Sequence, residues 1–420
     1  MKEILVKDKV EVNINGFDIN LVEKKIFETT RDLGARLLRD SIRRIEEYEL
    51  SKLERSCLCG GRLKNIGRVR RKITTTVGQV QYARTRFKCC SCGKERYPLD
   101  EALGLQGNGN VTLGLKEKTL YLATDTAYDK AADNLKKLTG IELSGRQIQN
   151  WAKEEGEKVQ ESVRRKREQI FDDNCVPESE EKRKRVFVQV DGTFVKDRSK
   201  PRSVECKVGV IYSEKAKVSK NRYRILDKRT YATVDNIDSF REEFIAECTG
   251  WGVWDAEEIL YVADGASWIK KMCKYDFPGA VYLLDFWHLA QNISRALGED
   301  HKRAADNWIA EVKTTSNARL LLKRIRSLYV RIRDPDLQER LRKLYGYVKS
   351  NEEGIENWKK VKCLGASGAI EKAVDITVAR RFKKRGMSWI RPGLSSLLSL
   401  RLLKLNGEWD KYWAARGVPV

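Results

Sequence analysis

Three acidic residues stand where the second half of the chain could carry out chemistry. Asp191 closes the run VFVQVD and Asp264 closes EILYVAD, and each is followed directly by glycine. Glu371 lies much later, in the helix-forming stretch GASGAIEKAV. Carboxylates that converge in one pocket repel one another unless divalent cations neutralise them, and carboxylate-bound metal ions catalyse the cleavage and joining of phosphodiesters. The three residues together predict a metal-dependent phosphoryl-transfer site.

Each acid has a simpler interpretation when it is taken singly. Asp-Gly is a frequent turn pair, so Asp191 or Asp264 could merely end a strand. Glu371 has an acidic neighbour, Asp375, one helical turn away on the same face. Asp375 is therefore the alternative third ligand. Taken jointly, the three acids favour a metal site over three unrelated turns.

The segments around these acids predict a mixed sheet with helices. Apolar, β-branched runs predict strands, and amphipathic runs predict helices. Strands are expected at 186–191, 204–212, 221–234, 258–264 and 280–285, with helices at 236–252 and 268–274. Three strands followed by alternating helix and strand is the order of the ribonuclease-H-like fold, whose first and fourth strands are adjacent. That order would bring Asp191 and Asp264 side by side. Alternating apolar and charged residues in 204–212 predict a half-exposed strand.

The catalytic core is expected in two parts, residues 181–288 and 361–420, separated by an all-helical insertion at 289–360. The insertion is rich in Arg and Lys and lacks a strand pattern. Glu371 is expected to begin an amphipathic helix. The inward side of that helix is predicted to hold Ile370, Val374 and Val378. The basic residues that follow, suited to holding a phosphate backbone, are Arg380, Arg381, Lys383, Lys384 and Arg385.

Cysteine spacing predicts a zinc ribbon in residues 57–105. Cys57 and Cys59 form one pair and Cys89 and Cys92 another, with strand-like sequence between them. Four thiolates would hold one structural Zn²⁺ in place of a large core, with Cys90 as a substitute ligand. A zinc site with a purely structural role is as well supported as a module that reads DNA bases. The module nonetheless carries a basic surface suited to phosphates, formed by Arg68, Arg70, Arg71, Lys72, Arg84, Arg86 and Lys88.

Two helical regions flank the ribbon. Residues 1–56 predict an amphipathic helix at 20–50 that packs on the protein, although pairing with a second copy is the alternative. Residues 106–180 predict a helix-turn-helix with its turn at Gly140, then a charged helical rod and the linker PESEEKRKR. The start of the second helix, where such motifs meet base edges, holds Arg146, Gln147, Gln149 and Asn150. Two packed helices that do not contact DNA remain the alternative.

Composition indicates the class of binding partner and the cellular compartment. The 420 residues, enough for several domains, include 83 Lys and Arg against 60 Asp and Glu, a formal charge of +23. This excess favours a polyanion, because each neutralised phosphate releases counterions, although a basic protein without a nucleic-acid partner is the alternative. No apolar run spans a membrane and no signal-peptide core is seen. The ten cysteines suit a reducing compartment, so the cytoplasm is expected.

A family resemblance appears in the same motifs. DGT, DGASWIK, LDFWH, and SGAIE followed by KRGMSW resemble the DDE transposases of prokaryotic insertion sequences. The Mutator-like branch, with an N-terminal zinc ribbon and a helical insertion before the last acid, is the most similar. The resemblance extends from about residue 57 to the end and is densest at 186–293 and 364–413.

The resemblance implies Mg²⁺-dependent DNA strand cleavage and strand transfer at the ends of an insertion sequence. Asp191, Asp264 and Glu371 would bind two Mg²⁺, while Asp285 and His288 would orient a ligand or contact DNA nearby. The implied partners are the terminal inverted repeats, target DNA and at least one further copy of the chain, in the cytoplasm at the nucleoid. The alternatives are a silent or domesticated DNA-binding regulator and a structure-specific nuclease of the same fold.

Three tryptophans lie close to the predicted acidic site in sequence. Trp268, Trp287 and Trp389 could stack on an unpaired base. Core positions are nevertheless expected for all three, because large aromatic side chains are usually buried.

Overall fold

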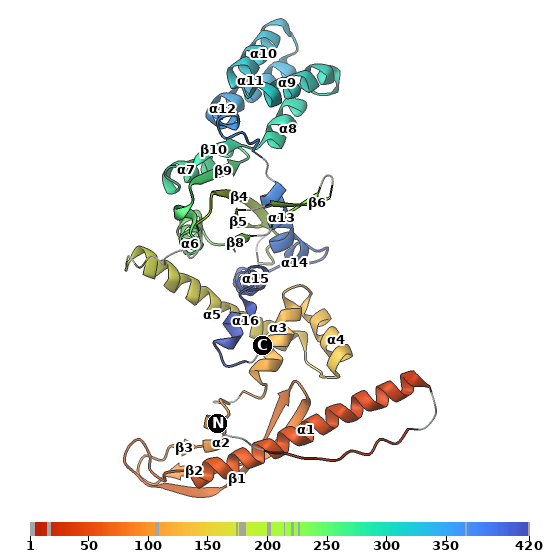
Figure 1. The fold of residues 1–420 in the computed structure, drawn as a ribbon, viewed down its shortest axis with the longest axis vertical. Coiled ribbons are helices and arrows are strands. Elements are labelled where there is room, and N and C mark those ends of the chain that lie inside the picture. Colours follow the sequence, from red (N-terminus) through yellow and green to blue (C-terminus); the bar gives the residue numbers. More distant parts are fainter. Residues whose placement is uncertain are drawn as a thin grey trace. The chain divides into compact units, whose positions relative to one another are not determined.

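The computed structural model describes residues 5–14, 18–105, 109–173, 175, 182–199, 203–213, 215–219, 222–225, 227–365 and 368–418 (Figure 1). The chain forms two compact units, one of Met1–Trp151 with Asp410–Val420 and one of Ala152–Trp409. Within these described ranges no helix is both long and apolar enough to cross a membrane. Most of the predicted linker PESEEKRKR, residues 177–181, lies outside them.

The first unit is built on a long helix and a long hairpin. Helix α1 (Ile19–Ser51) matches the predicted helix and is capped by Asp18, whose carboxylate accepts the N–H of Asn20. Strands β1 (Leu63–Thr75) and β2 (Gly78–Cys89) pair antiparallel, and β3 (Glu95–Arg96) adds a short third strand. The second half of α1 packs on the hairpin through Ile42. The large apolar side chains left exposed in its first half are Ile19, Leu21, Ile26 and Phe27.

Short helices complete this unit. They are α2 (Pro98–Ala102), α3 (Leu113–Ala123), α4 (Tyr128–Thr139) and α16 (Trp409–Ala414), together with the start of α5 (Gly145–Phe171). Helix α4 ends at Gly140, whose φ of 68° is left-handed and suits glycine. Two helices therefore meet at the predicted turn, and α5 continues as the predicted charged rod.

The second unit contains a five-stranded mixed sheet with the order β10–β9–β4–β5–β8. The strands are β4 (Arg185–Val195), β5 (Val204–Tyr212), β8 (Lys228–Thr233), β9 (Glu258–Ala263) and β10 (Val281–Leu284). Strand β5 pairs antiparallel with both β4 and β8, whereas β9 is parallel to β4 and β10 is parallel to β9. The first and fourth strands of this sheet in chain order, β4 and β9, are thus adjacent, as expected.

Three strand predictions need correction. The strand predicted at 186–191 continues to Val195, so Asp191 lies within β4, where it pairs with Val208 of β5. Strand β5 is buried over most of its length, because it lies between β4 and β8 and carries helices on its faces. Its Lys207 is buried too, and donates to the carbonyl of Asp235 at 3.2 Å. The predicted single strand 221–234 is two strands. Its first part, β7 (Arg222–Ile225), pairs with β6 (Lys215–Ser219) in a separate hairpin, and only β8 joins the sheet.

Helices surround the sheet and extend from it. Helices α6 (Ile237–Gly250) and α7 (Ser267–Asp276) alternate with the last strands as predicted. The chain then forms α8 (Phe286–Leu297), α9 (Lys302–Thr315), α10 (Ala318–Arg331), α11 (Pro335–Ser350) and α12 (Glu352–Lys360). One continuous apolar core joins these five helices to β9 and β10. Residues 289–360 are all described and contain no strand, which agrees with the predicted helical insertion.

The last part of this unit departs from a regular helix. Helix α13 (Gly368–Val374) widens into a π-helical turn at Asp375–Ala379, followed by α14 (Arg380–Phe382) and α15 (Arg391–Leu405). The buried guanidinium of Arg401 donates from Nε to the carbonyls of Ile376 and Thr377, each at 3.1 Å. The side chain thereby satisfies carbonyls in the widened turn. Ile370 and Val378 are buried as predicted.

Candidate active site and cysteine cluster

The pairing of β4 and β9 brings two of the acids together. Gln189 and Val262 form the last pair of this parallel ladder, and Asp191 and Asp264 each lie two residues beyond that pair. Both acids are half-buried at the carboxyl end of β9. Asp191 accepts the N–H of Gly192 at 2.7 Å, and Asp264 accepts the N–H of Ala266 at 2.8 Å. The two acids therefore lie near one another, close enough for the charge of Asp264 to raise the pKa of Asp191.

Glu371 reaches the same end of the sheet on α13, which packs against β4 and β5. The anchor is the buried side chain of Gln189, whose Oε1 accepts the backbone N–H of Ile370 at 2.9 Å. The Nε2 of Gln189 donates to the hydroxyl of Tyr212 at 3.2 Å. The residue before Glu371 is thereby fixed to the strand position two residues before Asp191.

Asp285 and His288 extend the cluster from the end of β10. Asp285 is fully buried and caps α8, because its Oδ1 accepts the N–H of Trp287 at 3.0 Å. Its Oδ2 lies 2.5 Å from Nδ1 of His288, and its own N–H donates to the carbonyl of Ala263 at 2.7 Å. Ligand atoms of Asp285, His288 and Glu371 lie within 4.8 Å of one another. Segments far apart in the sequence thus converge on one site.

The electrostatics of the cluster are those of an anionic pocket. Burial raises the pKa of Asp191, and the negative charges of Asp264 and Glu371 raise it further, against the N–H of Gly192 and the imidazole of His288. The hydrogen bond to Asp285 raises the pKa of His288, and the charges of Asp264 and Glu371 act in the same direction, whereas burial opposes them. Carboxylate oxygens grouped in this way are the donors that Mg²⁺ or Mn²⁺ prefers.

Asp375, the alternative third acid, is engaged elsewhere. Its carboxylate lies 2.9 Å from the guanidinium of Arg380 and 3.1 Å from the ammonium of Lys372. The hydrogen bonds from Arg380 and Lys372 lower its pKa. The geometry therefore assigns Glu371 to the acidic cluster and Asp375 to a surface ion-pair network.

The basic segment beyond Glu371 divides into two kinds of residue. Arg381 is buried, with its guanidinium 5.0 Å from the ring centroid of Trp389, so it differs from the expected surface position. Lys383 is exposed and donates to the hydroxyl of Thr193, just beyond Asp191. Lys384 and Arg385 are also exposed. Of these three exposed cations, Lys383 is the one whose contact places it beside the strand of Asp191.

The expected core position is wrong for Trp287. Its side chain is 60% exposed at the start of α8, one residue before His288. The exposed indole packs edge-to-face against Phe286, with centroids 5.5 Å apart. Trp268 and Trp389 are half-buried. A flat apolar surface therefore stands in solvent beside the acidic cluster.

The residues predicted to meet base edges lie on the first turns of α5, in the first unit. Arg146 and Asn150 are exposed, whereas Gln147 and Gln149 are half-buried. The side chain of Ser144 accepts the N–H of Gln147 at 3.2 Å and so caps the start of this helix.

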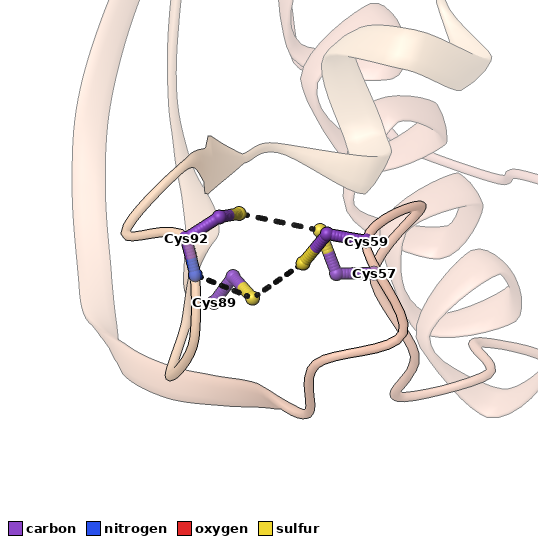
Figure 2. Close-up of side chains that lie close together, drawn as sticks. All are labelled: Cys57, Cys59, Cys89 and Cys92. Carbon is purple, nitrogen blue, oxygen red and sulfur yellow. Dashed lines mark hydrogen bonds between the residues drawn. The ribbon is translucent and has the colours of Figure 1, made fainter.

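The four predicted cysteines form a compact cluster (Figure 2). Sγ of Cys57 lies 3.7 Å from that of Cys92, and Sγ of Cys59 lies 3.5 Å from that of Cys89. These separations are far longer than a disulfide bond and close to the roughly 3.8 Å expected for thiolates 2.3 Å from a tetrahedral Zn²⁺. Cys90 is exposed outside the cluster. The residues present thus fit a four-thiolate metal site.

Two supporting residues were missed by sequence reasoning. Gln189 could have been noticed, because a lone amide inside the apolar run VFVQVD needs a buried partner. Tyr347 gave no such signal. Its hydroxyl donates to the backbone carbonyl of Asp264 at 2.7 Å, from a helix that looks ordinarily amphipathic in the sequence.

The chain is similar to known proteins over most of its length. The sequence model of an uncharacterised protein family, UPF0236, matches residues 12–414. A UPF0236 protein of Caldanaerobacter subterraneus subsp. tengcongensis is 25% identical over 417 residues, covering 94% of this chain and 81% of its own. A UPF0236 protein of Streptococcus gallolyticus, named for the vanSb 3′ region, is 26% identical over 358 residues, with 82% and 74% covered.

One solved structure, the Drosophila P element transposase strand transfer complex, matches at 13% identity and a TM-score of 0.25. The match covers 76% of this chain and 84% of that one. A TM-score this low does not establish a shared fold.

Proposed function

We propose that this chain, which belongs to the uncharacterised protein family UPF0236, is the DNA transposase of an insertion sequence. It would cut and join DNA strands at the element ends by metal-dependent phosphoryl transfer. The observation that carries the proposal is that Asp264 and Glu371 both lie close enough to Asp191 for their charges to raise its pKa, at the end of the β4–β9 ladder whose last pair is Gln189 with Val262. Such a concentration of negative charge is favourable when divalent cations occupy it.

The sheet supports a ribonuclease-H-like core. Its first three strands run antiparallel to one another, the fourth pairs parallel with the first, and the fifth pairs parallel with the fourth. This is the arrangement expected for that fold. The five helices between β10 and α13 correspond to the helical insertion that precedes the last acid in the Mutator-like branch.

The acids would hold two Mg²⁺, which supply Lewis acidity to the phosphodiester and help to deprotonate an attacking hydroxyl. The side chains of this chain have distinct tasks. Asp191, Asp264 and Glu371 bind the ions, while Asp285 orients the imidazole of His288 at 2.5 Å. Lys383, Lys384 and Arg385 are exposed and suited to the DNA backbone. Together these groups would hold a scissile phosphate over the acids.

A relative adds support of a different kind. The Caldanaerobacter protein carries eleven locus labels in its name. A protein encoded at many places in one genome is expected of an element that inserts copies of itself. A dedicated chromosomal regulator or repair nuclease has no comparable reason to be repeated.

The first unit would hold DNA for the second. Its four cysteines would bind one structural Zn²⁺, and the helix pair α4–α5 would act as a helix-turn-helix with Arg146, Gln147, Gln149 and Asn150 towards the bases. Because two element ends must be processed together, the active form would be at least a dimer. It would act on the nucleoid in the cytoplasm.

Strand cleavage tests the proposal. Purified protein is incubated with Mg²⁺ or Mn²⁺ and a duplex that contains the DNA bordering its coding sequence, and nicked and joined products are resolved on denaturing gels. Asp191→Asn, Asp264→Asn and Glu371→Gln should each abolish cleavage and leave DNA binding intact. Cleavage retained by all three variants would overturn the proposal. Cleavage of branched duplexes without joining would indicate a nuclease, and binding without cleavage would indicate a regulator.

A further inference from the structure

The two faces of the β1–β2 hairpin differ sharply in chemistry. On one face Ile73 pairs with Val80, and both are buried in a core with α1. On the other face Lys72 pairs with Gln81 and Arg70 with Ala83, and Gln79 follows beside Thr74. We call the exposed set on this second face, Arg70, Lys72, Gln79 and Gln81, the ribbon face.

The structure separates these cations from the other basic residues of the hairpin. Arg71 is buried and lies 2.6 Å from the buried carboxylate of Asp100, and Arg84 pairs with the same carboxylate. Arg68 pairs with Glu46. Neither Arg70 nor Lys72 forms an ion pair within the described part of the chain, and β1 and β2 contain no acidic residue at all. The positive charge of the ribbon face is therefore not neutralised by the protein.

We propose that the ribbon face binds double-stranded DNA in the major groove, with Arg70 and Lys72 on phosphates and Gln79 and Gln81 on base edges. This inference rests on the proposed function and adds a DNA-reading element separate from α5. A two-stranded ribbon fits the major groove of B-form DNA, and glutamine can bond an adenine through two hydrogen bonds there. Lysine and arginine contribute the phosphate contacts.

The hairpin is built to present this face rigidly. Its tip is a tight turn in which the hydroxyl of Thr75 donates to the carbonyl of Gly78 at 2.9 Å, and Gly78 has a φ of 115°. Its base ends at Cys89, a member of the cysteine cluster. Cross-strand pairing between these fixed ends sets the spacing of the two cations and the two amides. A preordered surface loses little conformational entropy on binding.

Double-stranded RNA carries the same phosphate charge but offers a different groove. The major groove of an A-form helix is deep and narrow, and side chains cannot read it. Binding through glutamine to base edges therefore requires DNA. RNA binding is an outcome that the experiment must be able to detect.

Fluorescence anisotropy of the full chain, without divalent cations, tests the phosphate contacts. The probes are a 40-base-pair duplex from the DNA bordering the coding sequence, a shuffled duplex and the corresponding RNA duplex. R70Q/K72Q should weaken DNA binding about tenfold or more and lower the salt slope by about two, because two phosphate contacts are lost. The matched control is K24Q/K25Q, a pair of exposed lysines on α1 with the same charge change. It should bind like the unaltered chain.

The amides are tested separately. Q79A/Q81A should bring the affinity for the bordering duplex down to that for the shuffled duplex, with the salt slope unchanged. The inference is overturned if R70Q/K72Q binds like the unaltered chain, or if K24Q/K25Q weakens binding equally. It is also overturned if Q79A/Q81A leaves discrimination intact, or if the RNA duplex is preferred. Zinc content and thermal melting of each variant show whether the hairpin is still folded.

A DNA cleavage assay distinguishes failure of the ribbon-face inference from failure of the proposed function. Asp191→Asn should bind the DNA probes like the unaltered chain, because the acids belong to the other unit. An intact ribbon-face effect in a protein that never cleaves DNA removes the transposase proposal alone. Normal cleavage, combined with unchanged DNA binding by the ribbon-face variants, would overturn only the inference that the ribbon face binds DNA.

Discussion

The side-chain oxygen of Gln189 accepts the backbone N–H of Ile370 at 2.9 Å. This bond joins the strand that carries Asp191 to the helix that carries Glu371, across 181 positions of sequence. Gln189 is fully buried, so nothing in solvent can replace it. One buried amide thus ties the third acid to the first.

Replacing Gln189 by methionine should lower stability and disturb the acidic site. The N–H of Ile370 would lose its acceptor, which costs about 1–3 kcal/mol for a buried group left unsatisfied, and the hydrogen bond from Gln189 to Tyr212 would also be lost. Urea unfolding measures the stability, and Mn²⁺ titration followed by calorimetry measures the site. Weaker Mn²⁺ binding is expected together with the loss of stability. Unchanged Mn²⁺ affinity in the destabilised variant would show that Gln189 does not position Glu371.

Glu371→Gln and Asp375→Asn form a matched pair of acid substitutions. Glu371→Gln should lower the cleavage rate by about a hundredfold or more, because a metal ligand contributes several kcal/mol to the transition state. Asp375→Asn should leave the rate within about threefold, since its carboxylate is paired with Arg380 and Lys372. Single-turnover cleavage of a labelled duplex gives both rates. The reverse ranking would transfer the role of third ligand to Asp375.

The sequence predicted strands β4 and β9 because apolar runs are local signals, although β4 continues past Asp191 to Val195. It failed where burial depends on distant partners. The charges of Glu205 and Lys207 suggested a half-exposed strand. Lys207 is nevertheless buried, because its ammonium donates to the carbonyl of Asp235 and pairs with the carboxylate of Glu205. The π-helical turn near Glu371 was equally hidden, since its carbonyls bond to Arg401, a residue far along the chain.

Trp287 shows the opposite error, an apolar residue expected in the core and found in solvent. Local sequence cannot reveal this exposure, because it depends on whether another element covers the start of α8. Trp287→Ala should change the free energy of unfolding by only about 0.5 kcal/mol, as expected for an exposed position. If the indole stacks on a base, Trp287→Ala should weaken binding of a duplex with unpaired ends by about 1–3 kcal/mol.

The test for Trp287 compares two substitutions and two probes. Trp287→Phe keeps a stacking ring and should retain most of the affinity that alanine loses. A fully paired duplex with blunt, closed ends is the control probe, and it should bind all variants alike. An equal loss on both probes would exclude base stacking, and a large loss of stability would show that the residue is structural after all.

Zinc retention should depend on pH through Cys89. Hydrogen bonds from the backbone N–H groups of Cys92 and Ser91 lower the pKa of the Cys89 thiol to about 6, against 9.0 ordinarily. A depressed thiol pKa stabilises the folded state of the cysteine cluster at pH values above 9, the ordinary pKa. This contribution is lost progressively as the pH falls from 9 to 6. Below pH 6 protons also compete with the metal for the thiolate. Bound zinc should therefore fall steeply below pH 6.

A metallochromic indicator follows zinc release from protein equilibrated between pH 5 and 9. Cys90→Ser is the matched control, because Cys90 is exposed outside the cluster beside Cys89, and it should hold zinc like the unaltered chain. Cys89→Ser should release zinc throughout this range, since three thiolates bind the ion more weakly than four. Zinc held equally well by Cys89→Ser, or lost on replacing Cys90, would contradict the assignment of Cys57, Cys59, Cys89 and Cys92 as the ligand set.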